Sequence, residues 1–285
     1  MTRLIAAELF KLRKRLMTRV LLYVLVGIVV VLYLLLYAVS RVTLPANGPP
    51  PGTLQNLLGL PVALPFAMSI LASFGSVLAV ILTASIIGNE YNWRTIRTML
   101  ICSEGRLRLL GAKLISVGIL IITGMVIGLA AGFIMSLVTT AIGGYSFDFS
   151  FATGGYLWDQ FLQFWRTLYV LLPYTLLGFL FAIVGRSAMP GIALGIGVFF
   201  LESIVTTFMI LAGGWVARIP DFLPSANVRA INTLNQLPQG IGGGFGGDNF
   251  QLPGVTHAFI TLAIYSLIFA VLAFYLFRKR DVTTN

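Results

Sequence analysis

Side chains that could catalyse a reaction are scarce in this sequence. His257 is its only histidine, so neither a two-histidine zinc motif nor a histidine-based catalytic triad can form. None of its lysines follows a glycine, which excludes the phosphate-binding loop of many ATPases. The nine acidic residues include no pair at catalytic spacing, and the single cysteine, Cys102, excludes an internal disulfide and gives no metal-site spacing. We therefore expect no catalytic residue, bound metal or cofactor in this chain.

Two ionisable residues lie inside apolar stretches, where charge is costly. Glu202 falls near the middle of one stretch, and Arg166 lies about two helical turns from the outer end of the preceding one. A charged acid at the centre of a membrane helix costs roughly 2.5–3.5 kcal/mol, so Glu202 should not face lipid. The two residues could form a structural interhelical pair or line a translocation path. Glu202 could instead bind and release a coupling proton.

Long apolar stretches dominate the rest of the sequence. Apolar residues make up 58% of the chain and charged residues 10%, and the mean hydropathy of +0.95 exceeds that of ordinary soluble domains. Six stretches approach or exceed the ~20 residues needed to cross a bilayer. These stretches cover residues 20–39, 64–87, 110–140, 160–184, 189–213 and 256–276. We predict an all-α, polytopic membrane protein with six transmembrane helices in a single domain, residues 1–285.

Positive charge is distributed unevenly among the segments that flank these stretches. Fifteen of the 19 Lys and Arg residues fall in the N-terminal segment, the second and fourth loops and the C-terminal tail. Under the positive-inside rule, these segments and both termini are cytoplasmic. The net charge of +10 is therefore explained by attraction to membrane lipid headgroups, and nucleic acid is not expected as a partner. Residues 1–19 show the pattern of an amphipathic helix at the cytoplasmic interface, with an ordinary basic flank as the alternative.

Small and helix-breaking residues predict how some of the helices are connected and packed. Gly124, Gly128 and Gly132 form a ridge on the third stretch, where another helix could approach closely. This ridge would serve packing within the chain or form the seam of a dimer. A very short turn at residues 185–187 predicts a helical hairpin. Residues 214–255 contain four prolines and a glycine-rich run, so we expect a flexible outer loop there.

The second loop, residues 88–109, is the most unusual polar segment of the chain. Trp93, Ile96 and Leu100 share one helical face, whereas Arg94 and Arg97 project around another. A short amphipathic helix of this kind can lie on the membrane surface or seat in a groove of a soluble partner. Composition alone slightly favours the membrane surface.

The order of residues in this loop resembles the cytoplasmic loop of permease subunits of ABC transporters of the type 2 exporter class. In that family a glutamate begins the loop, a Thr-hydrophobic-Arg triplet and a Ser-Arg or Gly-Arg step follow, and a lysine stands where the next span starts. The matching residues in this sequence are Glu90, Thr95, Ile96, Arg97, Gly105, Arg106 and Lys113. Arg94 stands where the family usually has a glycine. Residues 7–11 and 277–281 also resemble the ends of that family, so the similarity spans the whole chain in topology.

The resemblance implies a division of labour between subunits. This chain would be the non-enzymatic, membrane-spanning permease, and two copies of a separate ATP-binding subunit would bind ATP and Mg²⁺. A second permease subunit, identical or related, would complete the transporter. The loop at residues 88–109 would act as a coupling helix set into a cleft of the ATPase. The residues expected at that contact are Glu90, Tyr91, Trp93, Arg94, Thr95, Arg97 and Thr98.

The resemblance also implies a cargo class and a location. The exporter would move a hydrophobic or amphipathic substrate, such as a drug, a peptide antibiotic or a lipid-like molecule, across a bacterial cytoplasmic membrane. The competing interpretation is an ion-coupled secondary transporter that uses Glu202. That class is expected to show inverted repeats and several intramembrane acids, and we find no convincing repeat between the two halves of this sequence. The exporter is therefore the favoured interpretation.

Overall fold

The chain folds into long helices, as the apolar stretches predict. The computed structural model describes residues 2–41, 57–60, 62–93, 105–143, 150–235 and 252–279. Within these ranges the chain is all-helical and contains no β-strand, and six helices are long and apolar enough to cross a membrane. These helices are α2 (Leu16–Ser40), α4 (Ala63–Asn92), α6 (Arg106–Gly143), α7 (Gly154–Gly185), α8 (Ala188–Ala212) and α10 (Val255–Lys279). The predicted fold class, an all-α multi-pass membrane protein, is confirmed.

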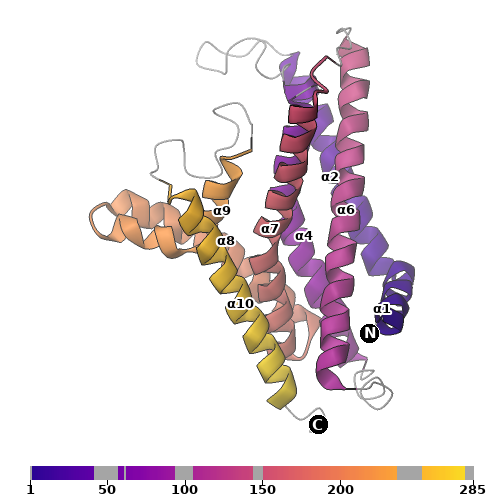
Figure 1. Cartoon of the computed structure of the whole chain (residues 1–285), viewed down its shortest axis with the longest axis vertical. Helices are drawn as coiled ribbons and strands as arrows, with labels where there is room; N and C mark the ends of the chain where they lie inside the picture. The colour runs from indigo at the N-terminus through magenta and orange to yellow at the C-terminus, as the bar shows by residue number, and fades with distance from the viewer. Residues whose placement is uncertain are drawn as a thin grey trace.

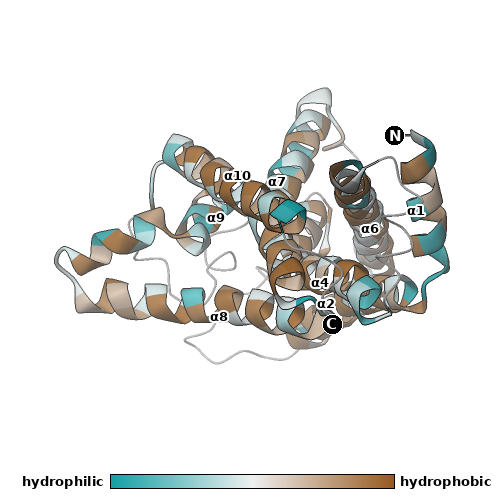
Figure 2. Ribbon diagram, turned by 90° about the horizontal axis from the view of Figure 1, so that it is seen from below, coloured by the Kyte–Doolittle hydropathy of each residue, from teal (hydrophilic) through white to brown (hydrophobic). Residues whose placement is uncertain are grey.

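Helices α4 and α7 form the centre of the bundle. In their most apolar stretches 72% and 67% of the residues are buried, compared with 11–22% in the other four long helices. Figure 1 shows α2 and α6 on one side of this central pair and α8 and α10 on the other. The ribbon of the peripheral helices is coloured mostly as hydrophobic (Figure 2), and many of their large apolar side chains are exposed, as expected where lipid replaces protein as the neighbour.

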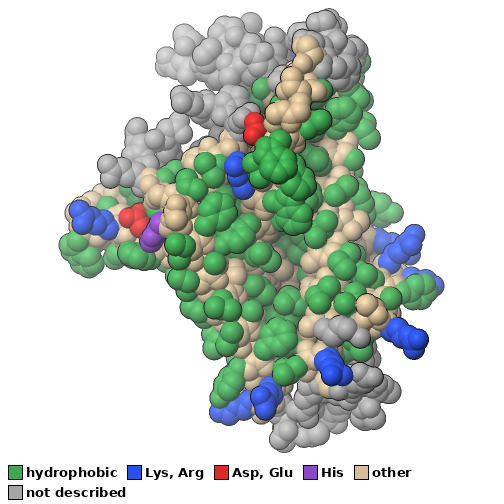
Figure 3. Space-filling view, viewed as in Figure 1, with side chains coloured by type: hydrophobic (Ala, Val, Ile, Leu, Met, Phe, Trp, Pro, Cys, Tyr) green, Lys and Arg blue, Asp and Glu red, His purple; other side chains and the backbone are tan. Residues whose placement is uncertain are grey.

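Both chain termini lie at one end of the bundle (Figure 1). Most of the Lys and Arg side chains visible in Figure 3 lie toward the same end. We call this the basic end and the opposite one the outer end. The positive-inside rule assigns the basic end to the cytoplasm.

The N-terminal segment forms a separate helix at the basic end. Helix α1 (Thr2–Lys14) is shorter than the predicted 1–19, because Arg15 adopts an extended conformation and α2 begins directly after it. On the inner face of α1, Leu12 is fully buried and joins a core cluster that includes Ile87 and Leu110. On its outer face, Phe10 is exposed. This two-sided pattern is the one predicted for an amphipathic helix at a membrane surface.

The outer connection contains structure that the sequence pattern did not predict. Residues 214–255 were expected to be a flexible loop, but the first half folds into η1 (Val216–Phe222) and α9 (Pro224–Asn232). Pro224 occupies the first turn of α9, where its fixed φ favours a helix and its missing N–H costs nothing. The glycine-rich run at 240–247 lies outside the described residues.

These two short helices are anchored on the bundle. Asn227 is fully buried, and its side-chain amide donates to the carbonyls of Asp221 at 2.8 Å and Leu223 at 2.7 Å. Ile231 is fully buried in a cluster that contains residues of α7 and α10. Apolar burial and satisfied backbone groups together explain why this part of the connection is ordered.

The glycine ridge on α6 packs within the chain. A Cβ atom on Gly128 would lie 2.6 Å from Leu71 Cδ2, and one on Gly132 would lie 2.6 Å from Ala67 Cβ. Gly124 faces α2, where its nearest neighbour would be Leu25. Since α2 and α4 already occupy this ridge, the structure supports the packing interpretation and leaves no room for a dimer seam there.

This close approach leads to a stability prediction. We expect Gly132→Ala to destabilise the protein by about 1–3 kcal/mol, because the added methyl group overlaps the Ala67 side chain, which cannot rotate away. Gly118→Ala is the matched control on the same helix, where a Cβ would meet nothing within 4 Å. Thermal unfolding in detergent micelles measures the difference. Equal melting temperatures for the two variants would contradict the close contact.

Candidate functional site

Five charged side chains meet at the basic end of the bundle, and we call them the ion-pair cluster. Three of them are cations and two are carboxylates, and they come from α1, the α1–α2 junction, α4 and α6. The members are Glu8, Lys11, Arg15, Glu90 and Lys113. The ion-pair cluster thus ties four separate segments of the chain together.

Glu90 is the centre of the ion-pair cluster. Its side chain is 1% exposed, and its Oε2 atom lies 2.6 Å from the Lys113 ammonium. Its Oε1 atom accepts from the Lys11 ammonium at 2.7 Å and lies 3.4 Å from the Arg15 guanidinium. Lys113 is 3% exposed and also lies 3.0 Å from Glu8 Oε1. A carboxylate this deeply buried requires cationic partners, and here three of them surround it.

The positions of the partners follow from where the helices begin and end. Glu90 lies in the last turn of α4, which ends at Asn92, and Lys113 lies about two turns after α6 begins at Arg106. The Glu90–Lys113 pair therefore joins both ends of the segment at residues 94–104, which is outside the described residues. Just beyond Glu90, Trp93 is 60% exposed and stacks with the Arg15 guanidinium, 5.3 Å from its ring centroid.

A second polar group lies around Glu202 of α8. One of its carboxylate oxygens accepts from the backbone N–H of Ser225, in the first turn of α9, and the other accepts from the Tyr174 hydroxyl at 3.4 Å. The hydroxyls of Ser225 and Thr206 lie 3.1 Å apart beside this contact. The N-terminus of a helix presents unpaired N–H groups and a positive dipole, so it is a suitable partner for a carboxylate.

The comparison with known families adds one assignment. A sequence model of the family described as "Protein of unknown function (DUF2705)" matches residues 51–283. The chain belongs to the DUF2705 family. The match includes Glu90, Lys113 and Glu202, whereas α1 and α2 precede it.

One relative of this DUF2705 chain is the "Uncharacterized protein YhcI" of Bacillus subtilis (strain 168). It is 26% identical over an alignment of 218 residues, and the match covers 71% of this chain and 63% of the relative. The chain therefore spans less than two thirds of the length of the relative that it matches. No solved structure matches the chain.

The structure of the DUF2705 chain corrects the predicted role of one residue at the expected ATPase contact. Several other residues predicted at that contact lie outside the described part of the chain. Glu90 was expected to contact a partner, but its carboxylate faces inward and is buried by Lys11, Arg15 and Lys113. The predicted loop at 88–109 is also shorter than expected, because α4 continues to Asn92 and α6 begins at Arg106.

The remaining predicted contact residues divide into two groups. Tyr91 is half-buried against the core, and Trp93 is exposed to the surroundings. Arg94, Thr95, Arg97 and Thr98 lie outside the described residues, so their placement at a partner surface stays a prediction.

The predicted pairing of Arg166 with Glu202 is wrong. Arg166 donates to the carbonyl of Leu234 at 3.2 Å and so ties the region after α9 to α7. Glu202 is instead engaged by Ser225 and Tyr174. The part of the prediction that kept Glu202 away from lipid is confirmed, since its side chain is buried.

Sequence patterns missed the partners of both acids. Residues 1–19 were predicted to form an amphipathic helix or an ordinary basic flank, and neither interpretation gave Glu8, Lys11 or Arg15 a partner. Glu8 and Lys11 are three residues apart and therefore share a helical face. That spacing was an available signal. Ser225 gave no signal, because it lies in a segment predicted to be loop.

The geometry of the ion-pair cluster leads to a second stability prediction. We expect Lys113→Met to destabilise the protein by about 3 kcal/mol, because it leaves Glu8 buried without its cation and removes the closest partner of Glu90. Lys14→Met, on the exposed face of α1, is the control and should change the melting temperature little. Equal effects of the two substitutions in a thermal unfolding assay would show that the ion-pair cluster does not hold α1 in place.

The contacts of Glu202 distinguish two substitutions. Glu202→Gln keeps an oxygen for the Ser225 N–H and should leave the melting temperature close to that of the wild type. Glu202→Leu leaves that N–H buried and unpaired, at a cost of about 1–3 kcal/mol. Unfolding in detergent measures both, together with proteolysis of the outer connection. If Glu202→Leu is as stable as Glu202→Gln, the carboxylate does not anchor α9.

Proposed function

We propose that this chain is the membrane-spanning permease subunit of an ATP-driven ABC exporter of the type 2 class. The observation that carries the proposal is the Glu90–Lys113 contact. It joins α4 and α6 at the base of the segment that resembles a coupling helix, and Lys11 and Glu8 extend the same contact to α1. A partner that pushes on this segment would therefore move three helices together.

Transport in this proposal depends on a two-state movement driven from the basic end. ATP binding would favour one arrangement of two ATPase subunits, and the segment at 94–104 would follow them. Ion pairs that are short and shielded from water resist separation, so the ends of α4 and α6 would shift as one body. From these ends the displacement would reach the centre of the bundle, because α4 packs directly on α7.

The chemistry around the segment suggests what the partner surface must offer. Trp93 supplies an exposed aromatic side chain, the residue type that most often anchors an interface. Arg94 and Arg97 follow it in the sequence, so an acidic cleft with an apolar floor would be complementary. A second permease copy or a related chain would complete the transporter in a bacterial cytoplasmic membrane, and the cargo would be hydrophobic or amphipathic.

The competing function, an ion-coupled carrier that uses Glu202, has less support. A coupling acid must exchange protons or ions with an aqueous path, whereas Glu202 is buried and bonded to Ser225 and Tyr174. These contacts fit a structural anchor. Normal transport by Glu202→Gln would remove the ion-coupled alternative, since an amide cannot carry the proton.

Affinity purification from the native membrane tests the proposal. The wild-type chain should retain an ATPase with a phosphate-binding loop, identified by mass spectrometry. A variant with Trp93→Ala, Arg94→Ala and Arg97→Ala should retain at least about tenfold less ATPase than the wild type. Truncation of such anchor residues commonly weakens binding by more than about tenfold. Arg218→Ala, in η1, is the matched control and should retain the ATPase.

Two outcomes would contradict the proposal. Gentle extraction that yields no ATPase with the wild-type chain would remove its basis. Equal retention by the triple variant would place the contact elsewhere on the chain. Gel filtration of each variant confirms that a loss of partner is not a loss of fold.

A further inference from the structure

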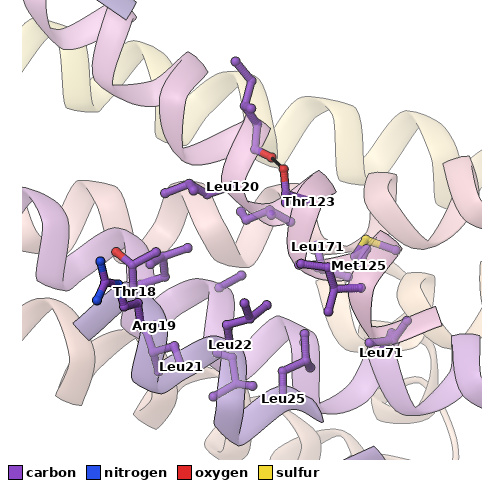
Figure 4. A pocket seen from close by; sticks show the side chains of 18 of the residues that line it. Thr18, Arg19, Leu21, Leu22, Leu25, Leu71, Leu120, Thr123, Met125 and Leu171 are labelled. Carbon is purple, nitrogen blue, oxygen red and sulfur yellow. Dashed lines mark hydrogen bonds between the residues drawn. The ribbon is translucent and has the colours of Figure 1, made fainter. Parts of the chain in front are cut away.

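A cavity of about 490 Å³ opens between α2, α4 and α6 near the basic end. Its volume falls in the range of ~300–1,000 Å³ that is common for ligand sites. Figure 4 shows Leu21, Leu22 and Leu25 along one wall, with Leu120 and Met125 across from them. The walls are therefore almost entirely aliphatic.

The cavity runs lengthwise along the helices, and its length is comparable to one half of a bilayer. On α4 its lining extends from Leu82 to Leu71, a rise of about 16 Å at ~1.5 Å per residue. Half of a hydrocarbon core that is ~30 Å thick is about 15 Å. On α2 the lining runs from Thr18 to Leu25, within the first turns of that helix, so the cavity opens at the α1–α2 junction and is about as long as one leaflet is deep.

Positive charge marks the shallow end of the cavity. Arg13 of α1 and Arg19 of α2 line it there, beside the hydroxyl of Thr18. The Arg19 Nε atom donates to the Arg13 carbonyl at 3.2 Å, which fixes its guanidinium at the mouth. Within the described residues neither arginine pairs with a carboxylate, because Glu8 and Glu90 are engaged by the ion-pair cluster.

We propose that this cavity binds an anionic phospholipid of the cytoplasmic leaflet, with one acyl chain along the leucine walls and the phosphate at Arg13 and Arg19. An aliphatic channel one leaflet deep with two cations at the water interface is complementary to such a lipid at both ends. The occupant joins α1 to α2, α4 and α6, and so it supports the helix that carries Glu8 and Lys11. This inference does not rest on the proposed transport function.

Binding to the delipidated, full-length protein in detergent tests the inference. The probes are phosphatidylglycerol, phosphatidylcholine with the same acyl chains, and inorganic phosphate, measured by native mass spectrometry and by the rise in melting temperature. We expect phosphatidylglycerol to bind about 10- to 30-fold more tightly than phosphatidylcholine, because two arginines contribute to its headgroup site. Inorganic phosphate alone should have no effect.

Two kinds of variant separate the headgroup site from the acyl-chain site. Arg13→Ala with Arg19→Ala should abolish the preference for phosphatidylglycerol, whereas Lys14→Ala on the same helix should keep it. Leu78→Trp, or Leu22→Trp if the first variant does not fold, should fill the cavity and weaken both lipids at least fivefold. Leu267→Trp, on the exposed face of α10, is the control for added bulk.

Several results would overturn the proposal. Equal binding of the two lipids by the wild type would remove the headgroup site, and so would an undiminished preference in the arginine variant. Unchanged lipid binding by folded tryptophan variants would show that the acyl chain lies elsewhere. Complete displacement of phosphatidylglycerol by inorganic phosphate would show that the site binds a simple anion and not a lipid.

Discussion

Charge that enters an apolar bundle has to be neutralised by the protein itself, and the rest of this structure depends on how that is done. Glu90 is surrounded by cations from α1, from the α1–α2 junction and from α6. Among the described residues no cation forms an ion pair with Glu202, which uses the first turn of α9 instead. In both cases the partners come from other parts of the sequence, so each acid ties separate segments together. The two acids anchor α1 at the basic end and α9 beside α8.

Helix α4 is the shared support between these two anchors. It carries Glu90, it receives the α6 glycine ridge through Leu71 and Ala67, and its Gly88 is in direct backbone contact with the start of α8 at Ala188. No side chain larger than hydrogen fits at Gly88, so the α7–α8 hairpin is held against α4 at the basic end. A displacement of α4 therefore cannot occur without repacking both flanks of the bundle.

Hydropathy and charge predicted the fold because they report on single segments. The six spans, the basic end and the amphipathic α1 each follow from a local pattern, and the structure has all three. The partners of Glu90 and Glu202 depend on which helices meet, and one sequence does not contain that information. The Arg166–Glu202 pairing failed for this reason, because α9 folds back and supplies a nearer donor from a segment whose prolines suggested a loop.

Helix α1 connects the ion-pair cluster to the lipid cavity. Glu8 and Leu12 share one face of α1, with Glu8 in the ion-pair cluster and Leu12 in the core, whereas Leu9 and Arg13 line the cavity from the neighbouring face. One rigid helix thus contacts both the base of the segment at 94–104 and the headgroup site. A lipid that binds more tightly when α1 is in this position than when α1 has moved stabilises the ion-pair cluster by mass action. The coupling is reciprocal, so a partner that moved α1 would change the affinity for the lipid by the same factor.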